Sequence, residues 1–231
     1  MKKKYIYSEQ NSLWGNPECV GFGSENFYIK EIDRKLANEI IVKNHYSKKF
    51  YNATYIHLGL FENNILKGVL QYGYAMNPAS CGSVVDGTKQ DEYLELNRMW
   101  LSDDIYIEYP ESQAISMSIS YIKKKYPKIK WIQSFADERC GGFGIVYQAC
   151  SFSYYGEHNS IFWEINGNIY HNSLMTRNPN LSKSAKFIQE NKDKAISYEL
   201  RQFRYIKFLD QREKKKCLLK EQPYPKHYFK C

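Results

Sequence analysis

The chain has 231 residues, of which 43% are hydrophobic, and this is enough for one large domain with a proper core. No apolar run approaches the roughly 18 residues of a membrane span, and the lysine-rich N-terminus lacks the apolar segment of a secretion signal. The six cysteines are scattered without a CxxC pair, which argues against a zinc ribbon and against a disulfide framework. We therefore expect a cytoplasmic protein with no membrane partner.

Charge is distributed unevenly along the chain. The net charge is +8, and residues 181–231 hold 14 Lys and Arg against 6 Asp and Glu, whereas residues 1–180 hold 19 of each class. The pattern from 181 to 219 also looks helical. We therefore predict a domain over 1–180, which begins with an irregular segment at 1–26, and a basic helical C-terminal extension over 181–231. Double-stranded DNA is the simplest polyanionic partner; a solvated helix kept soluble by lysines is the alternative.

The first half of the chain alternates between strand and helix patterns. Apolar residues recur at helical spacing after residue 32 and alternate with polar residues from residue 93. The expected elements are a short strand at 27–29, a helix at about 33–43, a hairpin of strands at 51–61 and 65–74, a loop at 75–91 and a strand at 93–101.

The second half begins with a helix. Pro110 and Glu111 suit its first turn, and it ends before Pro127. The elements expected after it are a strand at 129–136, a turn and helix at 140–150, and a closing hairpin of strands at 152–156 and 161–165. This order predicts an α/β layer fold. Its sheet is mixed, because a helical crossover after the strand at 93 makes that strand parallel to the next.

Two stretches have polar residues just beyond regular elements. Asp137 ends an expected strand before a glycine-rich turn, an arrangement that often forms a site at the carboxyl edge of an α/β sheet. His45 and Tyr46 follow the end of the first helix and precede Lys48 and Lys49. Each feature has a structural alternative, because Asp137 could be an N-cap and His45 a partner of the helix dipole.

The order of elements resembles the GNAT acyltransferase fold, and four segments resemble the phage Mom family of DNA adenine modification proteins. These segments are Asn44–Ser47, Glu95–Arg98, Ser134–Asp137 and Gly144–Ala149, and the resemblance covers about residues 30–230. It implies a GNAT-like mixed central sheet flanked by helices. It also implies an enzyme that adds a methylcarbamoyl (carbamoylmethyl) group to N6 of adenine in DNA and so protects phage DNA from host restriction.

The resemblance also assigns roles to residues of this chain. It implies catalytic roles for His45, Tyr46, Asp137 and Tyr147, and it matches Glu95 and Arg98 to a further polar pair that would bind substrate or cofactor. Family members have been proposed to use acetyl-CoA as the group donor and iron as a metal. His45, Tyr46 and Asp137 would offer such a metal an imidazole, a phenolate and a carboxylate.

The implied chemistry needs a base. Adenine N6 is a poor nucleophile because its lone pair is delocalised into the ring, so transfer requires a proton acceptor, a nearby electrophile and groups that orient the amine. His45 is the natural base near pH 7, and Asp137 could orient it or act itself. Tyr46 and Tyr147 could donate to a carbonyl oxygen or stack on a base drawn out of the duplex. For each residue the alternative is a structural role, and Glu95 and Arg98 could simply pair.

The group donor is less clear from the residues. The usual glycine-rich phosphate loop of GNAT enzymes is absent from residues 106–114. The start of the helix still offers backbone N–H groups, with Ser112, to a donor. Glu108 and Glu111 oppose an anionic one. This departure counts against ordinary use of acetyl-CoA and leaves another small-molecule donor open.

Contacts to DNA phosphates are expected from basic residues, without reading of the sequence: Lys48, Lys49, Arg201, Arg204, Lys214, Lys215 and Lys216. Two other functions stay open. One is a GNAT N-acetyltransferase that acts on a protein or small-molecule amine, which would not require the basic tail. The other is a non-enzymatic DNA-binding protein on a degenerate acyltransferase scaffold, which the missing phosphate loop favours. An oligomer is compatible with the sequence.

Overall fold

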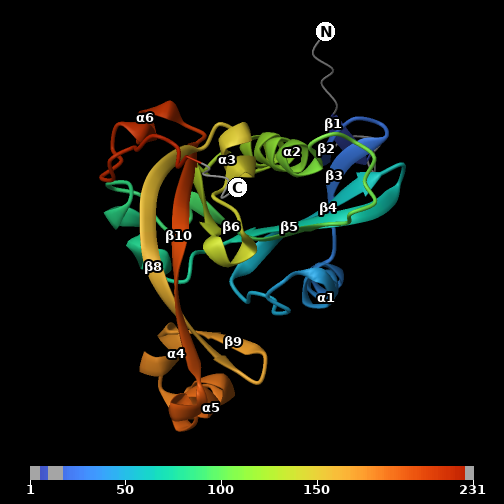
Figure 1. The fold of residues 1–231 in the computed structure, drawn as a ribbon. Coiled ribbons are helices and arrows are strands. Elements are labelled where there is room, and N and C mark those ends of the chain that lie inside the picture. The colour runs from blue at the N-terminus through green and yellow to red at the C-terminus, as the bar shows by residue number, and fades with distance from the viewer. Residues whose placement is uncertain (1–5, 10–17, 227–231) are drawn as a thin grey trace.

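The computed structural model describes residues 6–9 and 18–226 of the chain. Within this described part, the strands form one sheet of ten in the order β1-β2-β3-β4-β5-β6-β7-β10-β8-β9 (Figure 1). Neighbouring strands are antiparallel except β6 and β7, which are parallel and are connected by the helix α2. The mixed central sheet flanked by helices is therefore confirmed, with its parallel pair after the strand at 93.

The bounds of the elements agree well with the predicted order up to α3. The strands are β1 (Ile6–Glu9), β2 (Glu18–Gly23), β3 (Phe27–Glu31), β4 (Thr54–Glu62), β5 (Ile65–Gly73), β6 (Tyr93–Leu101), β7 (Trp131–Asp137), β8 (Ser153–Ile165), β9 (Asn168–His171) and β10 (Ile196–Phe208). The α-helices are α1 (Arg34–Asn44), α2 (Pro110–Lys125), α3 (Ile145–Ala149), α4 (Ser173–Thr176), α5 (Lys183–Glu190) and α6 (Gln211–Lys214). Because β1 and β2 are strands, the irregular segment predicted for 1–26 is wrong there; residues 1–5 and 10–17 lie outside the described part.

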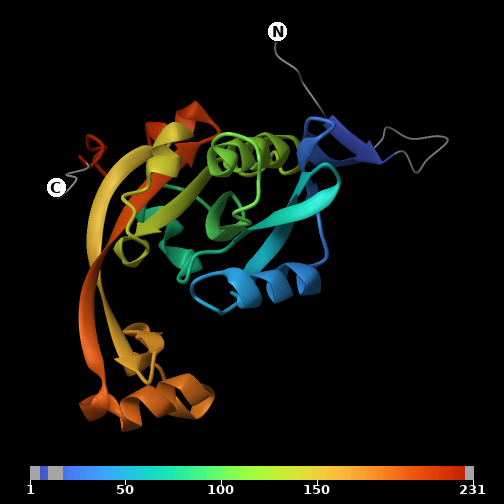
Figure 2. The ribbon, with the colours of Figure 1, turned by 45° about the vertical axis from the view of Figure 1, so that its right-hand side comes forward.

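Helices cover both faces of the sheet. α2 and α3 lie on one face and α1 lies on the other (Figures 1 and 2). α2 buries Ile115, Ile119 and Ile122, as their helical spacing predicts. α1 begins at Asp33, whose carboxylate accepts the backbone N–H of Lys35 at 2.7 Å and so caps the helix. No helix among residues 18–226 is long and apolar enough to cross a membrane.

The parallel contact between β6 and β7 is short. Three residue pairs join the two strands, and the last pair is Glu95 with Gln133. A bulge in the pairing of β5 with β6 follows directly and leaves Asn97 without an opposite residue. Bulges bend a strand, and beyond this point β6 stays paired with β5 while β7 stays paired with β10. The two strands therefore separate, and we call the space between them the opening.

The C-terminal segment is not the basic helical extension that we predicted. Ile196–Phe208 is the strand β10, and it lies inside the sheet between β7 and β8. Among the described residues after 181, only α5 and α6 are α-helical. Buried Phe203 and Tyr205 alternate with the more accessible Arg204, and this is the two-residue period of a strand. The abundance of lysine and arginine obscured that period.

The predicted closing hairpin is also wrong. Ser153–Ile165 is one continuous strand, and His158 and Asn159 lie within it, paired with β10. The turn lies instead at Asn166 and Gly167, whose φ angles are 51° and 72°, and it joins β8 to β9. Asn-Gly is the preferred sequence for a two-residue hairpin turn because both positions need positive φ. This dipeptide was the stronger turn signal.

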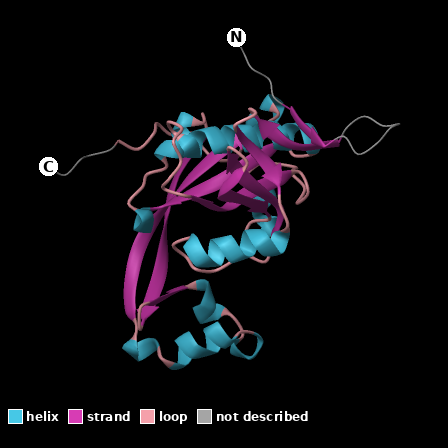
Figure 3. Cartoon of the chain, turned by 90° about the vertical axis from the view of Figure 1, so that its right-hand side faces the viewer, coloured by secondary structure: helices cyan, strands magenta, loops and turns pink. Residues whose placement is uncertain are grey.

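A long two-stranded ribbon projects from the sheet. β7 pairs with residues 202–208 of β10, whereas residues 196–201 pair with β8 alone. The ribbon ends in a small tip of residues 166–195, which contains β9, α4 and α5 (Figure 3). We call residues 159–201, ribbon and tip together, the arm. The arm extends on the side of the sheet that α1 covers (Figure 1).

The position of β10 generates the first prediction. Phe203 is fully buried, against the rings of Phe143 and Tyr154. Phe203→Ala should therefore lower the free energy of unfolding by about 3–5 kcal/mol, the usual cost of removing a buried Phe ring. Phe187→Ala in the tip, where the ring is 39% exposed, should cost clearly less. Urea unfolding followed by circular dichroism measures both, and equally small losses would contradict a central β10.

Candidate active site

Glu95 lies at the point where β6 and β7 separate. Its Oε2 accepts a hydrogen bond from Gln133 Nε2 at 2.9 Å, and its Oε1 accepts one from Asn97 Nδ2 at 3.0 Å. Burial of the carboxylate raises the pKa of Glu95 to about 7, because the two hydrogen bonds offset the burial only in part. Near neutral pH the group is divided between its acid and base forms, which suits a residue that transfers protons.

The two amides that hold Glu95 leave their own oxygens without a partner. Gln133 Oε1 and Asn97 Oδ1 are both buried, and neither accepts a hydrogen bond within the described part of the chain. Their orientation is fixed, because each nitrogen donates to Glu95 and Asn97 Nδ2 also donates to the carbonyl of Tyr74 at 3.1 Å. A buried acceptor without a donor costs about 1–3 kcal/mol. A ligand that brings N–H groups to this position would remove that cost.

His45 follows the last turn of α1, and its ring is held in one tautomer. The residue is buried, and the backbone N–H of Ser47 donates to its Nδ1 at 3.1 Å. Since Nδ1 accepts, the proton of the neutral ring is on Nε2. Burial, and then the charges of Arg98 and Arg139, lower the pKa of His45 to about 4. At pH 7 the ring therefore offers an N–H donor, an arrangement that suits a donor better than the base we predicted.

Arg139 connects the His45–Tyr46 pair to Asp137. The rings of His45 and Tyr46 lie 4.2 Å apart, and the Arg139 guanidinium lies 4.9 Å from the Tyr46 ring and 4.8 Å from the ring of Phe162. Asp137 binds Arg139 through the backbone N–H at 3.0 Å and through Nη2 at 2.8 Å. No hydrogen bond joins Asp137 to His45 among the described residues. Asp137 thus fixes a cation beside the tyrosine.

Tyr147 reaches the opening from the other face of the sheet. It belongs to α3, and its ring lies 5.6 Å from Phe152 and 5.4 Å from Tyr205. Burial raises the pKa of the Tyr147 hydroxyl to about 12, although a hydrogen bond with Ser134 acts in the opposite direction. Successive residues of a strand face opposite sides, so Ser134 and its neighbour Gln133 line the opening from different faces. Side chains from both faces of the sheet therefore meet at the opening.

Arg98 has no carboxylate partner among the described residues, so the simple pair with Glu95 does not form. Its guanidinium donates to the carbonyl oxygens of Asn97 at 2.6 Å and Lys49 at 3.4 Å, and it lies 5.8 Å from the ring of Tyr51. Carbonyl oxygens do not neutralise the charge. Arg98 therefore keeps an uncompensated positive charge beside the opening, and this charge suits a phosphate or another anionic group.

Three other predicted residues are engaged elsewhere. The Ser112 hydroxyl donates to the carbonyl of Tyr109, within its own turn, at 3.1 Å. Arg201 forms ion pairs with Glu138 at 2.6 Å and with Glu157 at 3.5 Å, so its charge is compensated. Arg204 lies 5.1 Å from the ring of Phe135, and burial lowers its pKa. The Ser112 hydroxyl and the Arg201 charge are therefore not free. Arg204 forms no ion pair among the described residues, but it is partly buried and close enough to Glu95 for the two charges to interact.

The lysines that we predicted to bind DNA fall into two groups. Lys48 and Lys49 follow His45, and they donate to backbone carbonyls of Lys43 at 2.6 Å and Ile169 at 3.2 Å. The lysines after β10 lie at the α6 end of the sheet. Two of them form ion pairs: Lys214 with Glu221 at 2.7 Å and Lys216 with Glu213 at 3.0 Å.

Four residues near the opening were not singled out from the sequence: Asn97, Gln133, Arg139 and His171. The His171 Nδ1 accepts the backbone N–H of Ser173 at 3.1 Å, the same arrangement that holds the ring of His45. Burial lowers the pKa of His171, and the charges of Arg139 and Asp137 also act on it. The spacing His-x-Ser occurs at both 45–47 and 171–173 and could have linked them.

The residues present do not fit the iron site that the resemblance implied. Within residues 6–9 and 18–226, no group of three or more His, Cys, Asp or Glu could hold a metal ion. His45 uses Nδ1 for Ser47, and both oxygens of Asp137 are bonded to Arg139. Burial raises the pKa of Tyr46, which disfavours a phenolate ligand.

Comparison with known proteins gives both sequence and structural relatives. The chain matches the Mom protein family over residues 26–226. It is 42% identical over 228 residues to a protein of Escherichia phage Mu named methylcarbamoylase mom, and the match covers 97% of this chain and 94% of that protein. Among solved structures, it is similar to the ribosomal-protein-S5-alanine acetyltransferase from Vibrio fischeri (12% identity, 83% and 97% of the two chains, TM-score 0.49). It is also similar to an N-acetyltransferase from Staphylococcus aureus Mu50 (13% identity, 80% and 100%, TM-score 0.48).

The family match covers all the residues of the candidate site. The four segments in which we recognised the resemblance contribute His45, Glu95, Asp137 and Tyr147, and these residues lie around the opening or are linked to it by Arg139. The family match also spans most of the described chain. The chain therefore belongs to the Mom protein family.

Proposed function

We propose that this protein is a DNA-modifying transferase that adds a methylcarbamoyl (carbamoylmethyl) group to N6 of adenine, with the effect of protecting phage DNA from restriction. The name of the phage Mu relative supports the type of group that is transferred. The observation that carries the proposal is the arrangement of Glu95 between two amides whose oxygens lack partners. This arrangement is complementary to an amine, because it offers one proton acceptor and two further hydrogen-bond acceptors.

The transfer step balances with Glu95 as the base. N6 attacks the methylene carbon of a carbamoylmethyl donor, a bond forms between N6 and that carbon, and the bond from carbon to the leaving group breaks. The leaving group keeps the electron pair, and one N6 proton passes to the carboxylate of Glu95. Loss of that proton as the bond forms restores a neutral amine, which is the task of a general base. The product is adenine with an N6–CH₂–C(=O)–NH₂ group.

Adenine fits the hydrogen-bonding pattern of the site. Its N6 amine is a donor, and the neighbouring ring nitrogen is an acceptor. Gln133 Oε1 or Asn97 Oδ1 would accept the second N6 hydrogen, and the Nε2–H of His45 would donate to the ring. A guanine presents an oxygen where adenine has the amine, and that oxygen would face acceptors. The base must leave the duplex to reach such a site, and Tyr46, which is 52% exposed, is available to stack on it.

The two faces of the opening suggest where the two substrates enter. The acceptor base would enter from the face of α1, where His45, Arg98 and Arg139 supply donors and positive charge. The donor would enter from the face of α2 and α3, where the Tyr147 hydroxyl could donate to the carbamoyl oxygen. The substrates would then meet where β6 and β7 separate, beside Glu95.

Acetyl-CoA alone does not satisfy this reaction. An acetyl group lacks the amide nitrogen of the product, and it would be attached through its carbonyl carbon. The start of α2 also offers little to a pyrophosphate, because Glu111 lies in its first turn and the Ser112 hydroxyl is bonded to Tyr109. The proposed donor is therefore a small molecule that already carries the carbamoylmethyl group on a leaving group.

The central experiment is mass spectrometry of nucleosides. DNA from cells that express the protein should contain adenine nucleoside heavier by one carbamoylmethyl group in place of a hydrogen, and fragmentation should locate that group on N6. Unmodified DNA from cells with abundant folded protein would reject the proposal. Acetylated protein or small-molecule amines in the same cells would favour an N-acetyltransferase.

Replacement of Glu95 tests its role as the base. Glu95→Gln should slow modification by about 10²- to 10⁴-fold, the usual contribution of a general base, while Glu39→Gln on the exposed side of α1 should not change it. The wild-type rate should rise with pH around a midpoint near 7, because the ionised carboxylate is the active form. A rate that is flat between pH 5.5 and 8.5 on a single-turnover assay would argue for a different base.

The same carboxylate should make folding pH-dependent. Because burial raises the folded-state pKa of Glu95, its contribution to stability is complete below the ordinary pKa of 4.5 and is lost as pH rises through about 7. Relative to Glu95→Gln, the wild type should thus lose up to about 3 kcal/mol of unfolding free energy between pH 4.5 and pH 9. Urea denaturation of both proteins across this range gives the difference. Parallel pH profiles would mean that Glu95 titrates normally.

A pair of substitutions separates a donor role from a base role at His45. Gln can present an N–H near the position of the imidazole Nε2, whereas Phe keeps the ring shape and has no donor. His45→Gln should keep activity within about tenfold, and His45→Phe should lose about 10²- to 10³-fold, as when one hydrogen-bond donor is removed from an active site. If both variants are equally inactive while folded, His45 acts as the base that the sequence first indicated.

A further inference from the structure

The arm is a structure in its own right, and only its base and β9 lie near the candidate site. A two-stranded ribbon is marginal in water, yet this one ends in a tip with buried side chains of its own. Ala185 and Ile188 of α5 are fully buried, the ring of Phe187 lies 5.8 Å from that of Tyr170, and Trp163 Nε1 donates to Asn172 Oδ1 at 2.9 Å. The six residues of β10 that pair with β8 alone span about 20 Å. The tip is thus a folded unit that lies beyond the end of β7.

The base of the arm borders the candidate site. The ring of Phe162 on β8 lies 4.8 Å from the Arg139 guanidinium, which also lies 4.9 Å from the ring of Tyr46. Lys49, four residues after His45, donates to the carbonyl of Ile169 at 3.2 Å and lies 5.0 Å from the ring of Tyr170, both on β9. A polymer that enters the opening from the face of α1 would therefore lie beside the arm.

The tip carries an excess of positive charge. Residues 166–195 contain five basic residues and two acids. Arg177, Lys183 and Lys194 are exposed and form no ion pair among the described residues, whereas the exposed pair Lys186–Glu190 is long at 3.9 Å. Lys183 is also the first residue of α5, where the helix dipole makes a positive charge unfavourable. An anionic partner would relieve that repulsion.

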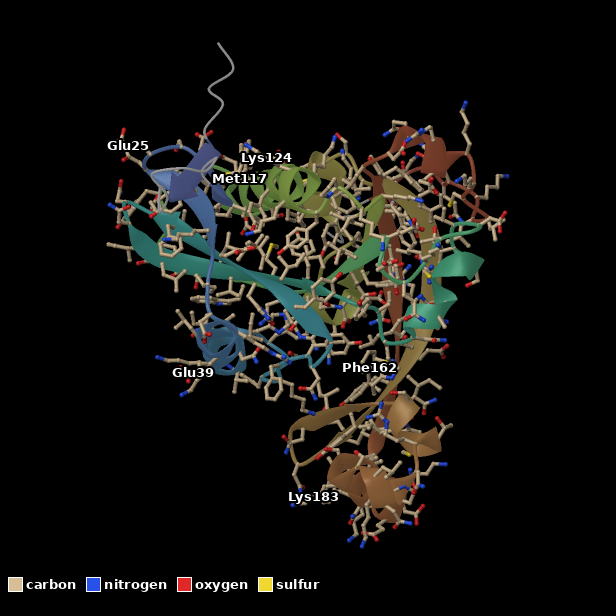
Figure 4. The ribbon with its side chains drawn as sticks, turned by 180° about the vertical axis from the view of Figure 1, so that it is seen from behind. Glu25, Glu39, Met117, Lys124, Phe162 and Lys183 are labelled. Atoms are coloured by element: carbon tan, nitrogen blue, oxygen red, sulfur yellow. The ribbon has the colours of Figure 1, made fainter. Side chains whose placement is uncertain are left out.

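The ribbon between site and tip does not share this excess. Its two acids are engaged, Glu164 with the hydroxyl of Tyr198 and Glu199 with Asn159. Its one basic residue, Arg201, is paired with Glu138 and Glu157. Positive charge is therefore concentrated at two places, around the opening and at the far end of the arm. Figure 4 labels Lys183 at the far end of the arm and Phe162 where the arm leaves the body.

We propose that the arm lies along double-stranded DNA and that its tip binds backbone phosphates to one side of the adenine in the opening. This inference rests on the proposed function, because it takes DNA as the substrate. The target lies beside Gln133, which pairs with Ile206, so the ten residues from there to Ile196 place the far end of the arm about 33 Å from the target. A duplex has a phosphate on each strand about every 3.4 Å along its axis, so the far end of the arm would contact phosphates up to about ten base pairs from the target. Contacts of this kind hold the duplex in register and read no sequence.

Matched double variants test the inference. Lys183→Gln with Lys194→Gln removes two tip charges, and Lys123→Gln with Lys124→Gln removes two exposed charges at the opposite end of the molecule, where Figure 4 labels Lys124. For the tip variant, the slope of log affinity against log salt should become shallower by about 1.8, because each lost phosphate contact contributes about 0.9. The control variant should keep the wild-type slope. All four lysines are exposed, so circular dichroism should show unchanged folding.

Asymmetric duplexes locate the contact. The test uses a duplex that contains a single target adenine, identified by mass spectrometry. The DNA that flanks this adenine is shortened to about four base pairs on one side or on the other, which is less than the expected reach of the tip. Shortening on one side should reduce wild-type affinity to the level of the tip variant, and the tip variant should not respond. Equal responses of the two proteins on both sides would overturn the inference.

Three outcomes distinguish the possible failures. If the tip variant keeps the wild-type salt slope, or if the control variant loses as much, the arm is not the DNA contact. If the tip variant instead changes the sedimentation of the protein from a dimer to a monomer with its slope unchanged, the tip is a subunit interface. The Glu95→Gln variant should bind DNA with the salt dependence of the wild type and should leave the DNA unmodified. A wild-type protein that neither binds nor modifies DNA would refute the proposed function itself.

Discussion

The separation of β6 from β7 after Glu95 is the constraint on which the rest of the site depends. A parallel pair normally continues its hydrogen bonds along both strands, but here the bulge at Asn97 ends the pairing after three residue pairs. The polar groups of the strands beyond this point need other partners, and side chains provide them. Gln133 and Asn97 donate hydrogen bonds to Glu95, and Ser134 Oγ donates to the carbonyl of Leu96 at 3.3 Å. A buried acid and two unmatched amide oxygens follow directly from this geometry.

The sequence predicted those parts of the fold that local periodicity determines. The helical spacing of Ile115, Ile119 and Ile122 and the alternation from Tyr93 to Leu101 gave α2 and β6, and their order required a parallel pair with β7. The same local patterns located His45, Asp137 and Tyr147 next to the ends of their elements. Charge composition was less informative, because Lys and Arg are compatible with helix, strand and coil alike.

What the sequence could not give depends on contacts between distant residues. β10 was missed because a strand in the centre of a sheet is defined by its neighbours, and β7 precedes it by more than sixty residues. The roles within the site have the same origin. Nothing in the segment from Asn44 to Ser47 reveals that Arg98 and Arg139 will lie close enough to keep His45 neutral, and nothing in the segment from Glu95 to Arg98 reveals that Gln133 will hold the carboxylate.

The central place of β10 has a consequence for synthesis of the chain. β7 and β8 cannot take their final positions until residues 196–208 are available to lie between them, since both strands pair with β10 and not with each other. A ribosome releases these residues after both β7 and β8. A nascent chain of 195 residues already contains Glu95, His45, Asp137 and Tyr147, yet β7, which carries Gln133 and Asp137, still lacks the strand on its other edge. Activity should therefore appear only after β10 has left the ribosome, as one late and cooperative event.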